Sequence, residues 1–216
     1  MKKRSGKTSK AQKPVRTLTV RTVKPVPRGC DAVILVGFMG AGKTSVGRAL
    51  GKLLNWEFED LDDRIERRAG RKIAEIFRDS GEREFRSAEH EALQNLLLEL
   101  PQGGQRIIAL GGGAFVQENN AMLLKSSAVP TVFLDAPVDD LWQRCSEQAA
   151  DAGTERPLLA SREQFRRLYK ERRKSYARAL HRIQTENRTV DAIAAEIARM
   201  LRLKKIEIRV EQGEIE

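Results

Sequence analysis

The sequence is poor in the residues that mark secreted or membrane-embedded proteins. Its 216 residues include two cysteines and two histidines, and aromatic side chains make up 5% of them. Cys30 and Cys145 are too few for a disulfide framework and lack zinc-ligand spacing, so we expect packing roles in a reducing compartment. No apolar run approaches the roughly 18 residues of a membrane span, and no apolar segment follows the basic start. We therefore expect neither a membrane partner nor a secretory signal.

Acidic residues are absent from the first 30 positions, which contain ten lysines and arginines. This segment accounts for the whole formal net charge of +10, because the other 30 basic residues balance the 30 acidic ones. A general basic surface is therefore not implied, and we expect no nucleic-acid partner; a salt-sensitive nucleic-acid anchor in the tail is the alternative. Three prolines and the lack of helical periodicity favour a disordered cytoplasmic extension at 1–28 over an organellar transit peptide.

What the chain does contain is an alternation of short apolar runs with longer helical patterns. The apolar runs cover residues 31–36, 56–59, 106–110, 131–134 and 182–184. The helical patterns cover about 43–54, 81–99, 117–127, 137–149, 161–180 and 189–202. This order predicts a three-layer α/β/α fold, with a parallel sheet of about five strands between helices. We assign 29–203 to this one domain and 204–216 to a C-terminal tail, which adds an edge strand or stays disordered.

Residues 37–44 read Gly-Phe-Met-Gly-Ala-Gly-Lys-Thr and have the spacing of a phosphate-binding loop. An apolar run precedes them and a helical pattern follows, so backbone N–H groups and a helix N-terminus converge on phosphate oxygens. We expect Lys43 to reach the β and γ phosphates and the Thr44 hydroxyl to ligate magnesium. The other candidate nucleotide contacts are Gly40, Ala41, Gly42 and Ser45. The loop thus predicts ATP and Mg²⁺ as cofactors, and a glycine turn that merely joins strand to helix is the alternative.

Carboxylates follow the second apolar run, at the sheet edge where open α/β folds bind ligands. Alternating strand geometry lets Asp60 and Asp62 point to the same side, toward the phosphate loop. We expect Asp60 to hold a magnesium-bound water and Asp62 to accept a proton from an attacking hydroxyl. A solvated acidic turn or a helix N-cap is the alternative, and it is the interpretation we prefer for Asp63.

Three consecutive glycines, Gly111, Gly112 and Gly113, follow the third apolar run. Their place beside the phosphate loop predicts that a ligand comes close to the backbone, whereas a triple glycine elsewhere could be only a flexible turn. The run before these glycines is not followed by the acidic residue that phosphate-loop ATPases usually have at the end of their second strand. This favours a small-molecule kinase over a motor protein or a GTPase.

In combination, these motifs resemble those of the shikimate kinases, which are small relatives of the nucleoside-monophosphate kinases. The resemblance covers about 31–203 and rests on six motifs in chain order: 37–44, 60–62, 81–86 with Glu89, 111–113, 156–159, and Arg172 four residues before Tyr176. It implies ATP- and Mg²⁺-dependent phosphorylation of the 3-hydroxyl of shikimate, in aromatic amino-acid (chorismate) biosynthesis. It also implies a cytoplasmic enzyme, which we expect to be a monomer.

The resemblance further implies roles for single residues. It assigns Asp62 to the ring hydroxyls, and Arg86 and Arg172 to the substrate carboxylate, which suits the forked geometry of guanidinium groups. Glu89 would orient Arg86, and the glycines at 111–113 would offer backbone contacts. These residues fall in an implied substrate-binding helical segment at about 61–90 and in the later motifs.

A lid at about 148–162 is the remaining expectation from the resemblance. Arg156 would reach from this lid to the transferring phosphate and stabilise the charge that develops there. Arg144 and the loop at 186–189 are candidates for adenine contacts. Two alternatives stay open: a gluconate-type kinase, disfavoured by Asp62 and Arg86, and a catalytically silent nucleotide-binding homologue, disfavoured by the intact Lys43.

Overall fold

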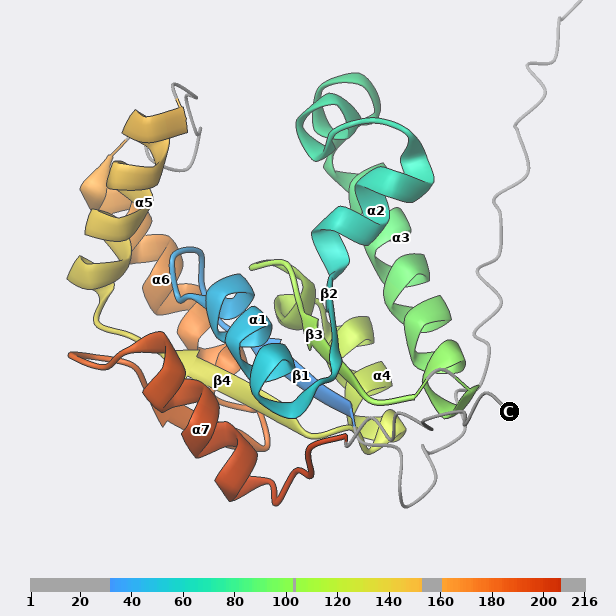
Figure 1. Cartoon of the computed structure of the whole chain (residues 1–216). Coiled ribbons are helices and arrows are strands. Elements are labelled where there is room, and N and C mark those ends of the chain that lie inside the picture. Colours follow the sequence, from blue (N-terminus) through green and yellow to red (C-terminus); the bar gives the residue numbers. More distant parts are fainter. Residues whose placement is uncertain (1–31, 103, 153–160, 207–216) are drawn as a thin grey trace, which may run out of the picture.

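The structure, a computed structural model, describes residues 32–102, 104–152 and 161–206. Its centre is one five-stranded parallel sheet in the order β2-β3-β1-β4-β5 (Figure 1). The strands are β1 (Ala32–Val36), β2 (Glu57–Asp60), β3 (Arg106–Ala109), β4 (Thr131–Asp135) and β5 (His181–Gln184). The predicted α/β fold with a parallel sheet of about five strands is therefore confirmed.

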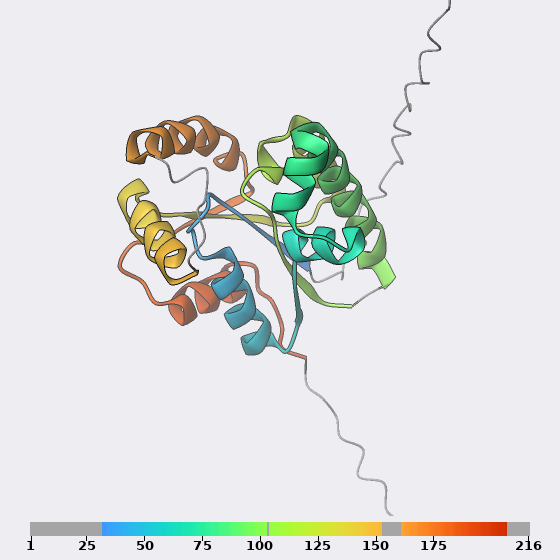
Figure 2. The same ribbon diagram turned by 90° about the horizontal axis from the view of Figure 1, so that it is seen from above.

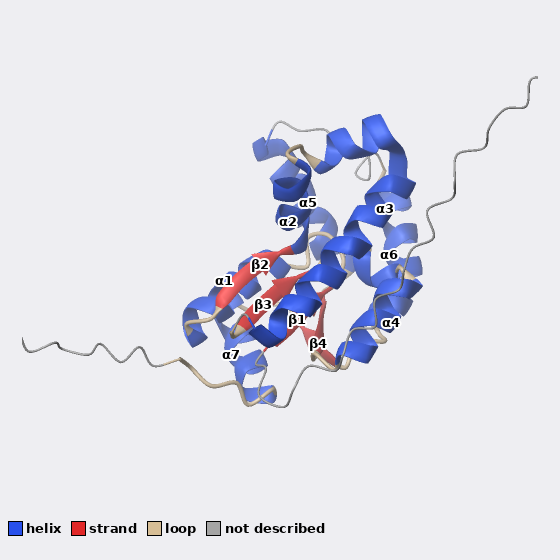
Figure 3. Ribbon diagram, turned by 90° about the vertical axis from the view of Figure 1, so that its right-hand side faces the viewer, coloured by secondary structure: helices blue, strands red, loops and turns tan. Residues whose placement is uncertain are grey.

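Helices cover both faces of this sheet, so the fold has the three predicted layers. On one face lie α1 (Lys43–Leu54) and α7 (Val190–Met200), and on the other lie α3 (Ile73–Glu99), α4 (Glu118–Ser127) and α6 (Arg162–Tyr176) (Figure 3). The helices α2 (Leu61–Ala69) and α5 (Val138–Ala152) extend beyond the carboxyl edge of the sheet, apart from one another (Figures 1 and 2). Two short 3₁₀ turns, η1 (Leu100–Gln102) and η2 (Ala114–Val116), complete the described elements.

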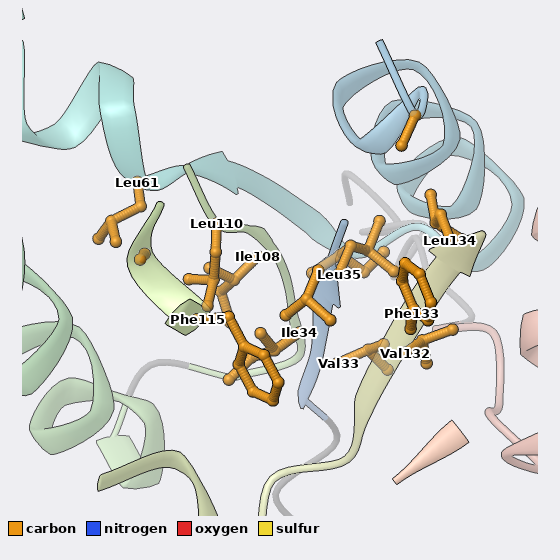
Figure 4. Packing of buried hydrophobic residues seen from close by; sticks show 14 of the residues in the cluster. Val33, Ile34, Leu35, Leu61, Ile108, Leu110, Phe115, Val132, Phe133 and Leu134 are labelled. Carbon is orange, nitrogen blue, oxygen red and sulfur yellow. The ribbon is translucent and has the colours of Figure 1, made fainter. Parts of the chain in front are cut away.

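The central strands form the hydrophobic core because helices cover them on both sides. Every residue of β1 is buried, and Val33, Ile34 and Leu35 have no exposed surface (Figure 4). A continuous apolar strand of this kind is typical of the middle of a parallel sheet. Each such side chain contributes roughly 1.5–3 kcal/mol through its burial. The core therefore holds the carboxyl ends of β1, β3 and β4 in fixed positions.

In the described part of the chain, no helix has both the length and the apolar character that a membrane crossing requires.

Residues 61–80 form α2 and the first part of α3, which agrees with the helical segment implied at about 61–90, although the apolar pattern alone indicated no helix there. Only Leu61 and Ile65 of α2 are buried, so its periodicity is too short to detect. The long helix α3 contains non-helical backbone at Gly81, with φ 80° and ψ 172°. The predicted helix at 81–99 is thus the second part of a kinked pair. At the other end, α6 stops at Tyr176 rather than at 180, because a turn there leads into β5.

The described start of the predicted C-terminal tail packs against the domain. The backbone N–H of Ile206 donates to the Leu54 carbonyl at 2.9 Å, and the buried Trp56 donates its indole N–H to the Lys204 carbonyl at 3.0 Å. Residues 204–206 form no strand. The rest of that tail, 207–216, and the predicted extension at 1–28 lie outside the described residues.

Candidate active site

The phosphate-binding loop connects the buried strand β1 to α1 at the carboxyl edge of the sheet. Gly42 precedes α1 with φ 85°, a left-handed conformation that favours glycine. The Lys43 ammonium donates to the carbonyls of Gly37 and Phe38, each at 3.0 Å. Burial lowers the pKa of Lys43, while the charges of Asp62 and Asp60 oppose that shift. Strand, glycine turn and helix are therefore arranged as the sequence predicts for this loop.

Asp60 joins the loop to the next element. The Thr44 hydroxyl donates to Asp60 Oδ2 at 3.0 Å, and the Asp62 backbone N–H donates to Asp60 Oδ1 at 3.1 Å, which makes Asp60 the N-cap of α2. Asp63 lies exposed within the first turn of α2, which agrees with the solvated acidic turn preferred for it, whereas the N-cap itself is Asp60. Asp60 therefore caps a helix, which is the alternative interpretation, and its carboxylate also contacts Thr44.

A hydroxyl beside a carboxylate is a suitable pair of oxygen donors for Mg²⁺. Mg²⁺ is usually bound through one or two protein oxygens, with waters and substrate phosphates as the other ligands. Thr44 and Asp60 fit that donor set, and no group of three or more His, Cys, Asp or Glu side chains that could hold a metal occurs in the described chain. The residues present thus match a cation shared with a nucleotide, rather than one enclosed by protein.

Asp62 has the properties of a proton acceptor. Its Oδ1 is buried and has no hydrogen-bond partner in the part of the chain that is described. Burial, followed by the negative charges of Asp60 and Glu89, raises the pKa of Asp62 to about 6. A Cβ on Gly111 would lie 2.4 Å from Oδ1, so a larger residue there would make this carboxylate shift. Asp62 is therefore ionised at neutral pH and becomes protonated in mild acid.

Arg86 lies on the other side of the glycine run. Its Nη1 donates to Glu89 Oε2 at 2.9 Å, and Glu89 is 1% exposed. Burial raises the pKa of Glu89, while the charges of Arg86 and Arg172 oppose the shift. A Cβ on Gly113 would lie 2.5 Å from Arg86 Nη1. Larger residues at the outer two glycines would therefore displace two site side chains, a consequence that sequence alone does not reveal.

Arg172 and Tyr176 of α6 both contact the middle glycine. Arg172 Nη1 donates to the Gly112 carbonyl at 3.3 Å, and the Tyr176 hydroxyl donates to the same oxygen. Tyr176 has no exposed surface, and burial raises its pKa to about 12, so the phenol stays protonated. The Arg172 guanidinium also lies 6.0 Å from the centre of the Phe38 ring. Arg86 and Arg172 therefore reach the same glycine loop from different helices.

Some predicted site residues lie outside this assembly. Arg156 and most of the predicted lid are outside the described residues, and the start of that lid, 148–152, belongs to α5. Ser45 is exposed in the first turn of α1, and Ala41 is buried in the loop. Arg144 Nη1 donates to the Gly40 carbonyl at 3.4 Å, which places it beside the loop.

Sequence reasoning missed two groups beside the site. Asp135, buried at the end of β4, is surrounded by side chains of α6 and β5. The same rule that singled out Asp60, an acid at the carboxyl end of an apolar run, could have found it. His90 Nδ1 donates to Asn120 Oδ1 at 2.7 Å, and buried Asn120 donates to the Ala114 carbonyl at 3.0 Å, just after the glycines. No spacing in the sequence indicates that pair.

A loop that binds nucleotide phosphates, next to a carboxylate that can take the proton of a hydroxyl, defines the class as a P-loop kinase of small molecules. A family model described as shikimate kinase matches residues 39–202. The chain therefore belongs to the shikimate kinase family.

Individual relatives and a solved structure agree with this family. A shikimate kinase of Cereibacter sphaeroides is 40% identical over 172 residues, covering 78% of this chain and 81% of the relative. One of Persephonella marina is 35% identical, covering 79% of this chain and 98% of the relative. The structure of shikimate kinase from Acinetobacter baumannii in complex with shikimate aligns with a TM-score of 0.70 at 35% identity, covering 82% and 96% of the two chains.

Proposed function

We propose that this chain transfers the γ phosphate of ATP to the 3-hydroxyl of shikimate, with Mg²⁺ as the metal. The observation that carries the proposal is the arrangement around the glycine run at 111–113. Asp62 lies next to its first glycine and Arg86 next to its third, and Arg172 donates to the carbonyl of its second. One ionisable acceptor facing two guanidinium groups suits a substrate that combines a hydroxyl with a carboxylate. The solved relative from Acinetobacter baumannii, which contains shikimate, supports this choice.

Asp62 serves as the general base in this proposal. A base works best when its pKa lies near the operating pH, and the pKa of Asp62 is about 6 instead of its ordinary 3.8. Oδ1, which is buried against Gly111, has no hydrogen-bond partner among the described residues, so the carboxylate keeps an unused acceptor. Asp62 thus accepts the proton as the hydroxyl oxygen attacks the phosphorus.

The phosphate loop holds the nucleotide. Its backbone N–H groups, with contributions from Gly40, Ala41, Gly42 and Ser45, bind the phosphate oxygens, and Lys43 neutralises their charge. Thr44 and Asp60 are the residues that hold Mg²⁺, with Asp60 acting through a bound water. When bound there, the cation would supply positive charge that stabilises the negative charge developing on the transferred phosphate.

Arg86 and Arg172 bind the substrate carboxylate and so orient the ring. Glu89 supports Arg86 through the contact of 2.9 Å, and the backbone at Gly111, Gly112 and Gly113 lines the ring. This orientation lowers the activation barrier because the substrate loses its translational and rotational freedom on binding, before the reaction step. Arg156, on the segment after α5, is proposed to contact the transferring phosphate as a lid over about 148–162 excludes water.

The direct test compares phosphoryl acceptors. Purified full-length protein is incubated with ATP and Mg²⁺, and ADP release is measured with shikimate, gluconate and nucleoside monophosphates. We expect turnover of shikimate alone, and formation of shikimate 3-phosphate identified by mass spectrometry and NMR. Turnover of gluconate without shikimate would support the gluconate-type kinase instead. Nucleotide binding without any turnover would support a silent homologue.

We further propose that the protein acts as a cytoplasmic monomer. Two cysteines in 216 residues suit a reducing compartment, and the described site is built within one chain. Light scattering after size exclusion should return a mass near the 24.3 kDa of a single chain. The basic N-terminal extension has no role in this proposal, so deletion of residues 1–28 should leave turnover and nucleic-acid retention unchanged.

A further inference from the structure

A buried carboxylate beside the substrate site has no part in the proposed chemistry. Asp135 ends β4 and is 6% exposed. It accepts hydrogen bonds from the Tyr169 hydroxyl at 3.1 Å, from Arg173 Nη2 at 2.7 Å and from Arg182 Nε at 2.7 Å. Tyr169 and Arg173 belong to α6, whereas Arg182 belongs to β5. One carboxylate therefore links the rigid sheet to the helix that carries Arg172.

The helix α6 contacts two fixed points through two neighbouring pairs of residues. Tyr169 and Arg173 are four apart, and both donate to Asp135. Arg172 and Tyr176 are also four apart, and both donate to the Gly112 carbonyl. Residues four apart lie one above the other on a helix, so each pair forms its own line along α6. Because one pair is held by Asp135 and the other by the Gly112 carbonyl, the two contacts together fix the rotation of α6 about its axis.

The phosphate loop takes part in the same arrangement. The Phe38 ring packs edge-on against Tyr169 with ring centres 5.5 Å apart, and the Arg172 guanidinium lies 6.0 Å from the centre of the Phe38 ring. Tyr169 therefore touches the loop with its ring and Asp135 with its hydroxyl. A rotation of α6 that released Asp135 would also move Arg172 relative to the loop.

We propose that Asp135 is a positioning residue for substrate binding, which holds α6 through Arg173 and Tyr169 so that Arg172 faces the carboxylate of the substrate. This inference rests on the proposed role of Arg172. Asp135 touches neither substrate nor nucleotide in this account. Asp135 affects substrate binding only by holding α6 to the sheet, and this contact sets the position of Arg172.

The chain offers a matched pair of variants that separates positioning from general stability. Arg173 and Arg182 both donate Nε and Nη2 to Asp135, and their side chains are 41% and 50% exposed. Arg173→Gln removes the link to α6, and Arg182→Gln removes the comparable link to β5. Each leaves one arginine on Asp135, which avoids the large destabilisation that follows when a buried charge loses all its partners.

The experiment measures KM for shikimate, KM for ATP and the melting temperature of the wild type and both variants. For Arg173→Gln we expect KM for shikimate to rise roughly tenfold, because small displacements of a binding group cost one to two orders of magnitude. KM for ATP should stay within about twofold, and Arg173→Lys should recover part of the loss. Arg182→Gln should lower the melting temperature by a similar amount while leaving KM for shikimate near wild type.

A double-mutant cycle identifies the route of the effect. If Arg173 acts through Arg172, then adding Arg173→Gln to Arg172→Gln should raise KM for shikimate by less than about twofold further, since coupled residues are not additive. Equal KM values for Arg173→Gln and Arg182→Gln, or full additivity in the cycle, would overturn the inference. Absence of shikimate turnover by the wild type would instead refute the proposed function.

Discussion

Asp62, the proposed general base, is a carboxyl group whose ionised form lowers the stability of the fold. Its Oδ1 is buried without a partner in the described chain, and its pKa rises from 3.8 to about 6, first through burial and then through the nearby acids. A raised pKa in the folded state means that the ionised form is destabilising. The penalty is complete above pH 6 and disappears as the pH falls toward 3.8.

The first prediction concerns the pH dependence of this residue. In the wild type, kcat/KM for shikimate should fall below an apparent pKa of about 6, because the base must be ionised. Asp62→Asn should abolish turnover yet raise the free energy of unfolding at pH 7.5 by up to about 3 kcal/mol. Denaturant titrations at pH 7.5 and pH 4.5 measure this difference, which should shrink at the lower pH. An Asn variant less stable than wild type at pH 7.5 would contradict the account.

Asp60 performs a structural task and a proposed catalytic task with different oxygens. Oδ1 accepts from the Asp62 N–H as a helix cap, and Oδ2 accepts from Thr44. Asparagine caps helices as well as aspartate does but lacks the charge that holds a cation. The two tasks can therefore be separated by substitution.

The second prediction compares Asp60→Asn with Asp60→Ala. The Asn variant should keep its stability within about 0.5 kcal/mol of wild type, whereas the Ala variant should lose about 1 kcal/mol with the cap. Both should need much higher Mg²⁺ concentrations for turnover. Urea unfolding and Mg²⁺ titration of the initial rate measure the two effects. Wild-type Mg²⁺ dependence in Asp60→Asn would refute the metal role.

At the scale of elements, the substrate-binding segment depends on one kink. Gly81 has φ 80° and ψ 172°, a backbone region that residues other than glycine scarcely adopt, and it divides α3 ahead of Arg86. An added Cβ there would meet nothing within 4 Å, so any cost of a side chain is backbone strain. Gly70, with φ 67° and ψ 15°, is in the ordinary left-handed region. Ala128, with φ 58°, shows that alanine adopts the latter within this chain.

The third prediction follows from that difference. Gly81→Ala should lower the free energy of unfolding by close to 3 kcal/mol, the upper end of the usual 1–3 kcal/mol for such strain, and Gly70→Ala by about 1 kcal/mol. Urea denaturation of both variants measures the ranking. If the two variants were equally stable, the kink would not be a constraint on the segment.

The apolar pattern of the sequence indicated all five strands, but it did not indicate α2, which has few buried residues. The runs that became β1, β3 and β4 are buried nearly throughout, so their composition alone indicates strands. By contrast, α2 buries only Leu61 and Ile65, and ion pairs such as that between Arg64 and Glu59, at 2.9 Å, cover its outer side. Pairings between elements leave no periodicity in the sequence.

The site shows the same division. The phosphate loop, Asp60, Asp62 and the triple glycine were predicted from their places at strand ends, and the family resemblance added Arg86 and Arg172. What the sequence could not show is what the glycines lie against, since a larger residue at Gly111 or Gly113 would displace Asp62 of α2 or Arg86 of α3. The same strand-end rule could have found Asp135, but not its partners Arg173 and Arg182, which are distant in the sequence and ordinary in composition.

At the scale of the whole molecule, the segment after α7 packs against the start of the domain, at the sheet edge opposite the site. After α7, residues 204–206 return to α1 and β2, where Trp56 donates to the Lys204 carbonyl and Ile206 donates to the Leu54 carbonyl. A domain that ended at the expected boundary of 203 would therefore lack these two hydrogen bonds. One of them satisfies the indole of a side chain that is 5% exposed.

The fourth prediction compares two truncated proteins, one ending at Leu203 and one ending at Ile206. The shorter protein should be less stable by about 1–3 kcal/mol, because the buried indole N–H loses its partner. Trp56→Phe in the longer protein should reproduce part of this loss. Equal melting temperatures for the two truncations would place the boundary at 203, as the sequence indicates.

The central claim is that Arg86 recognises the carboxylate of shikimate, and the most direct test is the pair of Michaelis constants in Arg86→Gln. Its matched control is Arg83→Gln, the same substitution at an exposed arginine of α3. The account predicts that Arg86→Gln raises KM for shikimate at least about tenfold and leaves KM for ATP within about twofold, because only the substrate carboxylate loses its two-pronged donor. An unchanged KM for shikimate in Arg86→Gln, with Arg83→Gln equal to wild type, would contradict it.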